Sequence, residues 1–260
     1  MPEPKPVEAG APARRVRLEP LMGTVITLDL RDAAVPTAAA DSVFAWFHEV
    51  DAVFSTFRSD SEISRLSRGE LSESQCRREV REVLGLCEEV RQLSGGSFDV
   101  RHGGTLDPSA LVKGWSVERA AGLLTTAGAR NFAINAGGDV LVRGEPVPGQ
   151  PWRVGVRHPE VADRVAAVLG VRNLAVATSG AYERGRHIAD PRRGGPASGP
   201  LSMTVVGPSL TYADAYATAA FVMGDDGAGW VGGIGGYEAL AITARGTTVS
   251  TPGIAALIVP

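Results

Sequence analysis

The sequence predicts a mixed α/β or α+β fold, in which helices are interleaved with the strands of mixed sheets. Apolar residues recur every three or four positions in some segments and alternate with polar residues in others, and the two patterns follow one another throughout the chain. No repeat of fixed period is present. The 260 residues, 44% of them hydrophobic, can form one large domain, with two closely packed halves as an alternative.

Composition limits the class of function. A formal net charge of -3 provides no broad basic surface, so the sequence does not indicate a nucleic-acid-binding protein. Residues 1–15 are rich in Pro, Ala and charge, which predicts a disordered leader before a domain at 16–260. This leader contains no apolar run typical of a signal peptide or membrane span, so we expect a cytoplasmic protein.

The first half of the chain predicts a strand followed by helices. Residues 16–30 alternate as one strand, in which Gly23 indicates a bulge or the close approach of a ligand. Residues 36–57 and 74–93 have helical periodicity, and Phe57 completes the apolar stripe of the first helix. Cys76 and Cys87 fall in the second helix, about 16 Å apart by helical rise, which is too far for a disulfide.

The second half predicts further helices and strands. One helix begins near Trp115 and ends around Gly128, and a second spans residues 212–224. Strands are expected at residues 131–135, 140–142, 152–156, 173–178 and 203–206. Residues 238–243 and 247–250 form a predicted hairpin across Arg245-Gly246.

The helix predicted at residues 212–224 presents two oxygen-bearing side chains. Asp214 and Thr218 are four residues apart and therefore lie one above the other on one helix face. A carboxylate and a hydroxyl placed in this way suit Mg²⁺, which prefers oxygen ligands. The structural alternative is that Asp214 caps the helix and Thr218 bonds back to a backbone carbonyl.

Glycine-rich polar clusters follow several predicted strands. They are Asn135-Ala-Gly-Gly-Asp139, Thr178-Ser-Gly180 and the Gly103-Gly104 turn. Backbone N–H groups in such turns can bind phosphate, although a Gly-Gly-Asp sequence after a strand is more often a simple hairpin turn. No cluster matches the dinucleotide fingerprint or the P-loop, which argues against an NAD-type oxidoreductase.

In combination and in order, these motifs resemble the FAD:protein FMN transferases, the flavin transferases also called ApbE-like proteins. The resemblance extends over roughly residues 20–245. It is carried by Met22-Gly-Thr24, Ser55-Thr-Phe-Arg-Ser-Asp-Ser-Glu-Ile-Ser64, Gly95-Gly-Ser-Phe-Asp-Val100, Asp107-Pro-Ser-Ala-Leu-Val-Lys-Gly114, Asn135-Ala-Gly-Gly-Asp139, Ala177-Thr-Ser-Gly180, His187-Ile-Ala-Asp-Pro191 and Ala213-Asp-Ala-Tyr-Ala-Thr218.

The resemblance implies a reaction and a metal site. Such enzymes bind FAD with Mg²⁺, cleave its pyrophosphate and pass FMN to a Ser or Thr hydroxyl of a target protein as a phosphoester, releasing AMP. The implied Mg²⁺ ligands are Asp214, Thr218 and the backbone carbonyl near Ala110. Lys113 is expected to reach the same phosphates or a neighbouring carboxylate; the alternative is an exposed lysine at a helix start.

The resemblance also implies a base and a flavin site. His187, with Asp190 close in sequence, is the candidate that activates the acceptor hydroxyl, because neutral imidazole is available near pH 7. The expected flavin contacts are Met22, Phe57, Ser97, Phe98, Asp99, Asp107 and Ile188. The expected floor of the cleft, or the pyrophosphate contacts, consist of Asn135, Gly137, Gly138, Asp139, Ser179 and Gly180.

Two features depart from the family pattern. Many relatives begin with a signal sequence and a lipid-bearing cysteine, whereas both cysteines here are internal, and Val112 stands where small residues are common. Since no flavin-carrier domain is evident, we expect an acceptor protein in trans. An FAD pyrophosphatase that yields FMN and AMP, and an FAD-binding protein without turnover, are the alternative functions.

Overall fold

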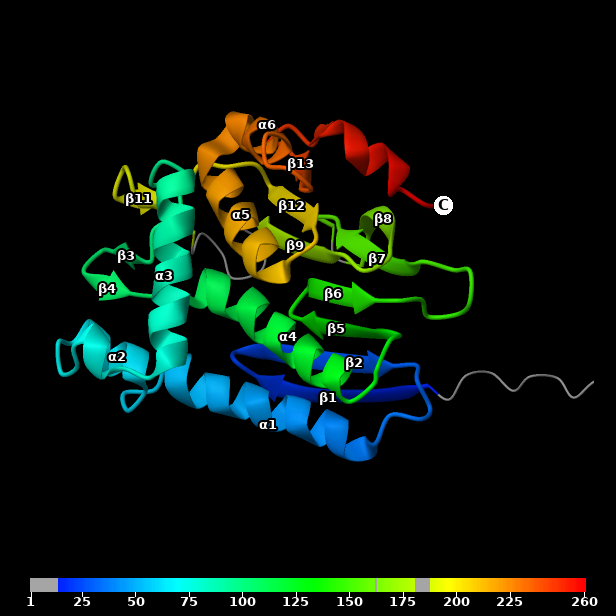
Figure 1. Ribbon diagram of the computed structural model, residues 1–260. Helices are drawn as coiled ribbons and strands as arrows, with labels where there is room; N and C mark the ends of the chain where they lie inside the picture. Colours follow the sequence, from blue (N-terminus) through cyan, green and yellow to red (C-terminus); the bar gives the residue numbers. More distant parts are fainter. Residues whose placement is uncertain (1–13, 162, 181–187) are drawn as a thin grey trace, which may run out of the picture.

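The structure is a computed structural model that describes residues 14–161, 163–180 and 188–260 (Figure 1). Within these residues, eight strands form one antiparallel sheet in the order β1-β2-β5-β6-β9-β12-β13-β14. The predicted mixed α/β fold is confirmed, whereas the expectation of mixed sheets is wrong for the described strands, whose pairs are all antiparallel. The strands of the sheet are β1 (Arg15–Leu21), β2 (Thr24–Leu30), β5 (Phe132–Ala136), β6 (Asp139–Arg143), β9 (Ala175–Gly180), β12 (Ser202–Gly207), β13 (Glu238–Ile242) and β14 (Thr248–Ser250).

The remaining elements cover this sheet or extend from it. The α-helices are α1 (Thr37–Phe54), α2 (Glu62–Ser67), α3 (Arg78–Leu93), α4 (Ser109–Thr126), α5 (Leu210–Met223) and α6 (Gly227–Gly232). Short 3-10 turns are η1 (Glu73–Gln75), η2 (Gly224–Asp226) and η3 (Pro252–Ala256). In the described part of the chain, three two-stranded sheets pair β3 (Arg101–His102) with β4 (Thr105–Leu106), β7 (Trp152–Arg157) with β8 (Val165–Val171), and β10 (Ala189–Asp190) with β11 (Gly195–Pro196).

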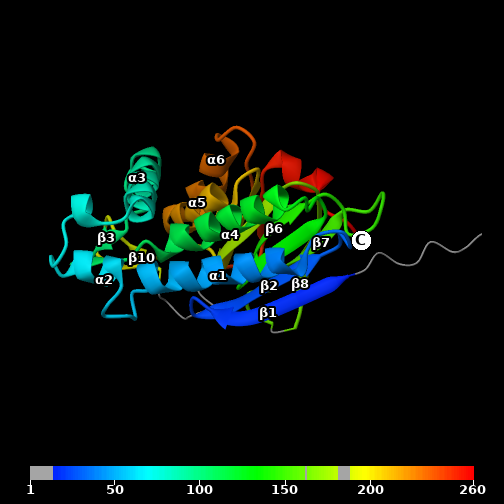
Figure 2. The same cartoon turned by 60° about the horizontal axis from the view of Figure 1, so that its bottom comes forward.

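The sheet separates two apolar cores. Helices α1, α4 and α5 lie across one face, where their side chains pack with Leu28, Ile134 and Val205 of the strands (Figures 1 and 2). The β7–β8 hairpin and η3 pack against the other face, where Trp152 and Leu169 contact a smaller core. Successive side chains of a strand point to opposite faces of the sheet, so alternate residues of the strands enter the two cores. No helix in the described ranges is long and apolar enough to cross a membrane.

The single strand expected at residues 16–30 is wrong. Met22 and Gly23 both have positive φ, 54° and 70°, and they form a two-residue turn between β1 and β2. Positive φ at both central positions is the geometry of a type I′ hairpin turn, which matches the twist of paired strands. Gly23 therefore reverses the chain and does not mark a bulge.

Helix boundaries differ from the expected ones in three places. α1 ends at Phe54, so Phe57 lies beyond the helix and is 91% exposed; it is not part of the apolar stripe. α3 begins at Arg78, so Cys76 precedes it, and the two cysteines do not share a helix, although both are free and buried. α4 begins at Ser109, well before Trp115, and the sequence pattern missed strand β8.

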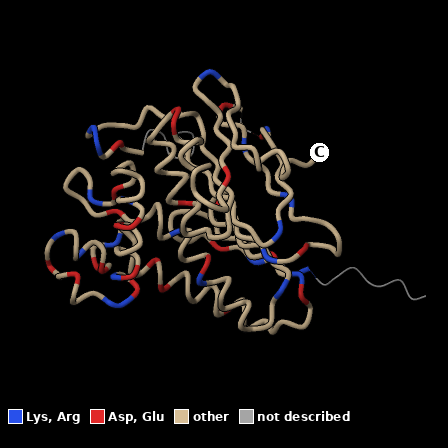
Figure 3. Tube along the Cα trace, turned by 45° about the horizontal axis from the view of Figure 1, so that its top comes forward, with Lys and Arg blue, Asp and Glu red and all other residues tan. Residues whose placement is uncertain are grey.

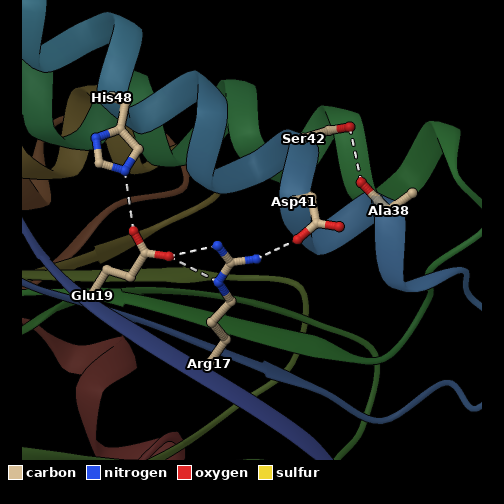
Figure 4. A network of polar contacts seen from close by, with 6 residues as sticks. All are labelled: Arg17, Glu19, Ala38, Asp41, Ser42 and His48. Carbon is tan, nitrogen blue, oxygen red and sulfur yellow. Dashed lines mark hydrogen bonds and ion pairs between the residues drawn. The ribbon is translucent and has the colours of Figure 1, made fainter.

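Charged side chains attach α1 to the edge strand β1. Arg17 donates to Glu19 at 2.6 Å and to Asp41 of α1 at 2.6 Å, and His48 Nε2 lies 3.2 Å from the second oxygen of Glu19 (Figure 4). Ser42 donates back to the Ala38 carbonyl within the helix. Figure 3 shows acidic and basic positions interspersed along the trace.

Helices α4 and α5 cross in direct backbone contact. At Gly114 of α4, an added Cβ would overlap the Leu210 carbonyl oxygen and lie 3.1 Å from Asp214 Cβ. Only glycine allows two helices to approach this closely at such a point. The crossing brings the first turns of α4 next to the first turns of α5, and these turns carry several of the predicted site residues.

Replacing Gly114 tests this crossing. We expect Gly114→Ala to lower the free energy of unfolding by about 1–3 kcal/mol, because the new methyl group must push the helices apart. Gly122→Ala in the same helix has open space around its Cβ and should raise stability by about 0.5–1 kcal/mol. Urea unfolding of both variants gives the comparison; equal effects would contradict close contact at Gly114.

Candidate active site

A lysine between two buried aspartates lies at the crossing of α4 and α5. Lys113 Nζ is 2.5 Å from Asp139 Oδ2 and 3.7 Å from Asp214 Oδ1. Asp139 begins β6 and is 1% exposed, while Asp214 lies in the second turn of α5 and is 4% exposed. Lys113 is partly exposed, so the charge cluster opens to solvent on its side. The alternative of a merely exposed lysine at a helix start is wrong, because Lys113 makes these ion pairs.

Backbone amides support both carboxylates. The Gly114 amide donates to Asp214 Oδ2 at 3.1 Å, and the Thr178 amide donates to Asp139 Oδ1 at 3.0 Å. Each aspartate is thus held by one N–H group from a neighbouring element while its other oxygen faces Lys113. The carboxylates are fixed in direction, and their positions depend on the helix crossing and on the pairing of β6 with β9.

Thr218 lies one turn after Asp214 on α5, as the sequence spacing predicts. Its hydroxyl is 3.1 Å from the Ser179 hydroxyl at the end of β9. The N-cap of α5 is Ser209, so Asp214 does not cap the helix, and the structural alternative for that residue is wrong. Asp214 and Thr218 therefore present a carboxylate and a hydroxyl on the helix face that meets Lys113 and Ser179.

Burial governs the ionisation of Asp214. Desolvation raises the pKa of Asp214 well above its ordinary value, the Lys113 ammonium partly opposes this rise, and the Asp139 carboxylate adds to it. Among the described residues, the two carboxylates lie beside one ammonium, so the cluster has an excess of negative charge when both carboxyl groups are ionised. A bound cation would compensate that charge.

The donor set fits Mg²⁺ with few protein ligands. Among the described residues, no group of three His, Cys, Asp or Glu side chains could hold a metal. Mg²⁺ is commonly bound through one or two carboxylates, with waters and substrate phosphates completing the octahedron. Ala110, in the first turn of α4, contributes a carbonyl whose regular helical donor is the Gly114 amide, the same group that donates to Asp214. Asp214, Thr218 and the Ala110 carbonyl therefore form a chemically suitable set.

Two glycine turns lie at the same end of the sheet as the cluster. Gly137 and Gly138 have φ values of 62° and 100° and connect β5 to β6, directly before Asp139. The Gly137 amide donates to the Val25 carbonyl, which places this turn against the start of β2. Met22, in the neighbouring turn, packs against the main core with its sulfur 3.9 Å from the Ser116 hydroxyl of α4.

Several predicted residues have contacts that stabilise local structure. Asn135 accepts from the Gly138 amide at 2.8 Å and shapes the turn, and Asp107 accepts from the Ser109 amide at 3.0 Å where α4 begins.

The other predicted residues lie at a strand end, in the core or outside the described residues. Gly180 ends β9 opposite Ser202. Ile188 packs against the main core, and its carbonyl accepts from the Ala197 amide. His187 lies outside the described residues.

The segment at residues 97–99 separates into buried and open positions. Ser97 and Phe98 are buried, and the Ser97 hydroxyl has no hydrogen-bond partner among the described residues. Asp99 accepts from the Arg101 amide at 2.7 Å and lines a cavity of about 420 Å³ between α3 and β3. The lining of this cavity does not include Lys113, Asp139 or Asp214, so Asp99 is not part of the charge cluster.

Comparison with known proteins assigns the family. The profile of the ApbE family matches residues 22–106 and 101–241. This chain belongs to the ApbE family.

The curated FAD:protein FMN transferase of Haemophilus influenzae is 34% identical over 132 residues, which cover 46% of this chain and 38% of that protein. The transferase of Rhodobacter capsulatus is 37% identical over 156 residues, covering 56% of this chain and 30% of that protein. The matched segments therefore span well under half the length of these curated relatives.

Solved structures share the fold of this ApbE-family chain. The flavin transferase ApbE from Vibrio cholerae superposes with a TM-score of 0.82 at 22% identity, covering 94% of this chain and 99% of that one. The ApbE protein from Thermotoga maritima superposes with a TM-score of 0.86 at 21% identity, covering 95% and 100%. At this level of identity the likeness establishes the fold, which extends over nearly the whole of both chains.

Sequence patterns missed the backbone groups of the site. The Gly114 and Thr178 amides bind the two aspartates across 100 and 39 residues of chain, respectively. The Lys113-Gly114 pair was visible as a motif, and glycine directly after a helical lysine is the signal that could have indicated a close crossing. Nothing in the sequence pattern points to the Thr178 amide, because every residue other than proline has a backbone N–H group and the residue type does not show which of them binds a carboxylate.

Stability against pH tests the Asp214 environment in this ApbE-family protein. A carboxyl whose pKa is raised on folding binds its proton more tightly in the native state, so the native state loses stability as pH rises through the window between the two values. In EDTA, the free energy of unfolding of Asp214→Asn should therefore increase relative to wild type as pH rises from about 4, the ordinary aspartate pKa. Asp225→Asn, at an exposed carboxylate, should follow wild type. If the free energy of unfolding of the wild type instead increased relative to that of Asp214→Asn as pH rises, the effect of burial on Asp214 would be contradicted.

Proposed function

We propose that the protein transfers FMN from FAD to a Ser or Thr hydroxyl of a target protein and releases AMP, with Mg²⁺ required. The observation that carries the proposal is the cluster of Lys113, Asp139 and Asp214 at the α4–α5 crossing, beside the Thr218 hydroxyl. Membership of the ApbE family supports it, as do relatives that are named FAD:protein FMN transferases.

The proposed reaction replaces the phosphoanhydride bond of FAD with a phosphoester bond at the same phosphorus. The phosphoanhydride of FAD breaks, the acceptor oxygen bonds to the FMN phosphorus, and AMP leaves. Phosphoryl transfer of this kind depends mainly on positioning and on compensation of phosphate charge. When bound, Mg²⁺ would compensate the charge on the phosphate oxygens. Asp214, Thr218 and the Ala110 carbonyl are its proposed ligands.

The chain's own groups would position the substrate and move the proton. Lys113, partly exposed and already beside Asp214, can extend its ammonium to a phosphate oxygen at the open side of the cluster. Gly137 and Gly138 are proposed to shape the floor of the cleft beside Asp139, because their amides already donate to the Val25 carbonyl and to Asn135 Oδ1. His187 is proposed to accept the proton of the acceptor hydroxyl. The residues proposed to surround the flavin are Met22, Phe57, Ser97, Phe98, Asp99, Asp107 and Ile188.

Exposure of Phe57 is consistent with a role in binding. The loop before α2 is held by Ser61, whose hydroxyl donates to the Ser55 carbonyl at 2.7 Å and accepts from the Ser64 amide at 3.1 Å. Arg68 donates to the Ser59 carbonyl at 2.7 Å in the same loop. A phenylalanine that is 91% exposed on a loop fixed in this way offers its ring to a partner without a large cost in loop entropy.

The first test follows both products of the reaction. Purified protein is incubated with FAD and Mg²⁺, with and without a peptide that carries a Ser/Thr acceptor, and AMP and peptide mass are measured. We expect AMP release with a gain of one FMN on the peptide, reduced about 100-fold or more in Asp214→Asn. His187→Ala should reduce transfer, whereas Asp225→Asn should retain it.

Other outcomes of this test identify the alternatives. AMP and free FMN that form equally with any acceptor protein present would indicate an FAD pyrophosphatase. Tight FAD binding without AMP release, across a series of acceptors and divalent cations, would indicate a binding protein and contradict both enzymatic functions.

Ligand-linked stability tests the metal site separately. At a Mg²⁺ concentration of 100 times Kd, the wild type should gain about 2.7 kcal/mol of stability, because the cation binds the native state alone. Asp214→Asn should lose this gain, and Asp225→Asn should keep it. Thermal unfolding in a Mg²⁺ titration provides the measurement; an equal gain in Asp214→Asn would place the cation elsewhere.

A further inference from the structure

A carboxylate of α4 caps the first turn of α5. One oxygen of Glu118, Oε2, accepts from the Ser209 hydroxyl at 2.7 Å, from the Thr211 hydroxyl at 2.6 Å and from the Thr211 amide at 3.1 Å. Ser209 is the N-cap of α5, yet its side chain makes no capping bond to its own helix. The hydrogen bond that an N-cap side chain would accept from the Thr211 amide is instead accepted by Glu118, 93 positions before Thr211 in the chain.

Electrostatics favour this arrangement. The first amides of a helix have no partners within it, and its N-terminus carries partial positive charge, so a carboxylate is a stabilising acceptor there. Hydrogen bonds to a charged acceptor contribute more than neutral ones. Glu118 is half-buried, which reduces the competition from water.

Glu118 and Gly114 form two points of attachment between α4 and α5. They are four residues apart, so they lie on the same face of α4. Gly114 contacts Leu210 and donates its amide to Asp214, while Glu118 holds Ser209 and Thr211. Two contacts one turn apart fix both the rotation and the axial position of α5 against α4.

The consequence reaches the proposed metal ligands. Ala110 and Lys113 are on α4, whereas Asp214 and Thr218 are on α5, so the site exists only in one register of the two helices. We propose that Glu118 is a positioning residue that sets this register and thereby the affinity of the site for its divalent cation. This inference rests on the proposed function, since it concerns the cation of that site.

Metal binding without turnover tests the inference. Mn²⁺ serves as the probe, and its binding to the purified 260-residue protein without FAD is measured by electron paramagnetic resonance. We expect Glu118→Ala to weaken Mn²⁺ binding about 10- to 100-fold, the range typical when a residue that orients metal ligands is removed. Glu118→Gln retains an acceptor oxygen without the charge and should show a smaller loss.

A stability-matched variant separates positioning from general destabilisation. Val154→Ala truncates the smaller core on the opposite face of the sheet, and it should lower stability without changing Mn²⁺ affinity. Hydrogen exchange of the Ala213 amide, which bonds to the Ser209 carbonyl, should accelerate in Glu118→Ala more than in Val154→Ala.

The outcomes distinguish the inference from the proposed function. Mn²⁺ affinity that falls equally in Glu118→Ala and Val154→Ala, or in neither, overturns the positioning role. Another outcome is that the wild type transfers no FMN while Glu118→Ala, but not Val154→Ala, weakens Mn²⁺ binding. That combination of results refutes the transferase function and supports the positioning role. A wild type that binds no Mn²⁺ overturns both the cation site and the inference.

Discussion

The contact of α4 with α5 at Gly114 is the constraint on which the rest of the site depends. Without a side chain at this position, the two helices meet backbone to backbone, and the Gly114 amide reaches the Asp214 carboxylate. The same approach places Lys113 between Asp214 and Asp139 of the sheet. Any larger residue would separate the helices and move the acidic groups apart. A packing requirement and a chemical one are thus met by the same glycine.

The charge cluster at this crossing is unfavourable for the stability of the folded protein. Burial of two carboxylates with one ammonium costs desolvation free energy that their attraction only partly offsets, and the raised pKa of Asp214 reflects this cost. Proteins retain such arrangements at functional sites, where a ligand supplies the missing charge. Neighbouring groups hold the charged side chains in place: the amides of Gly114 and Thr178 bind the carboxylates, and Glu118 holds the helix that carries Asp214.

Local sequence pattern was sufficient for much of the fold and for one part of the site. Helical periodicity located α1 and α3, an apolar run located α5, and the 238–250 hairpin has the predicted turn at Gly246. The spacing of Asp214 and Thr218 correctly placed both on one face of α5. Elsewhere local rules were ambiguous. The local sequence Met22-Gly23 is compatible with either the interior of a strand or a turn, and only the pairing of β1 with β2 decides between them.

The sequence by itself determined which chemical groups are present, which of them share a helix face, and to which family the order of motifs points. It could not determine which groups from separate elements meet. Lys113 with Asp139, Gly114 with Asp214 and Glu118 with Thr211 are contacts across 26, 100 and 93 residues. The tertiary structure decided these, because they depend on the distance and angle at which α4 and α5 cross over the sheet, and no local pattern encodes that geometry.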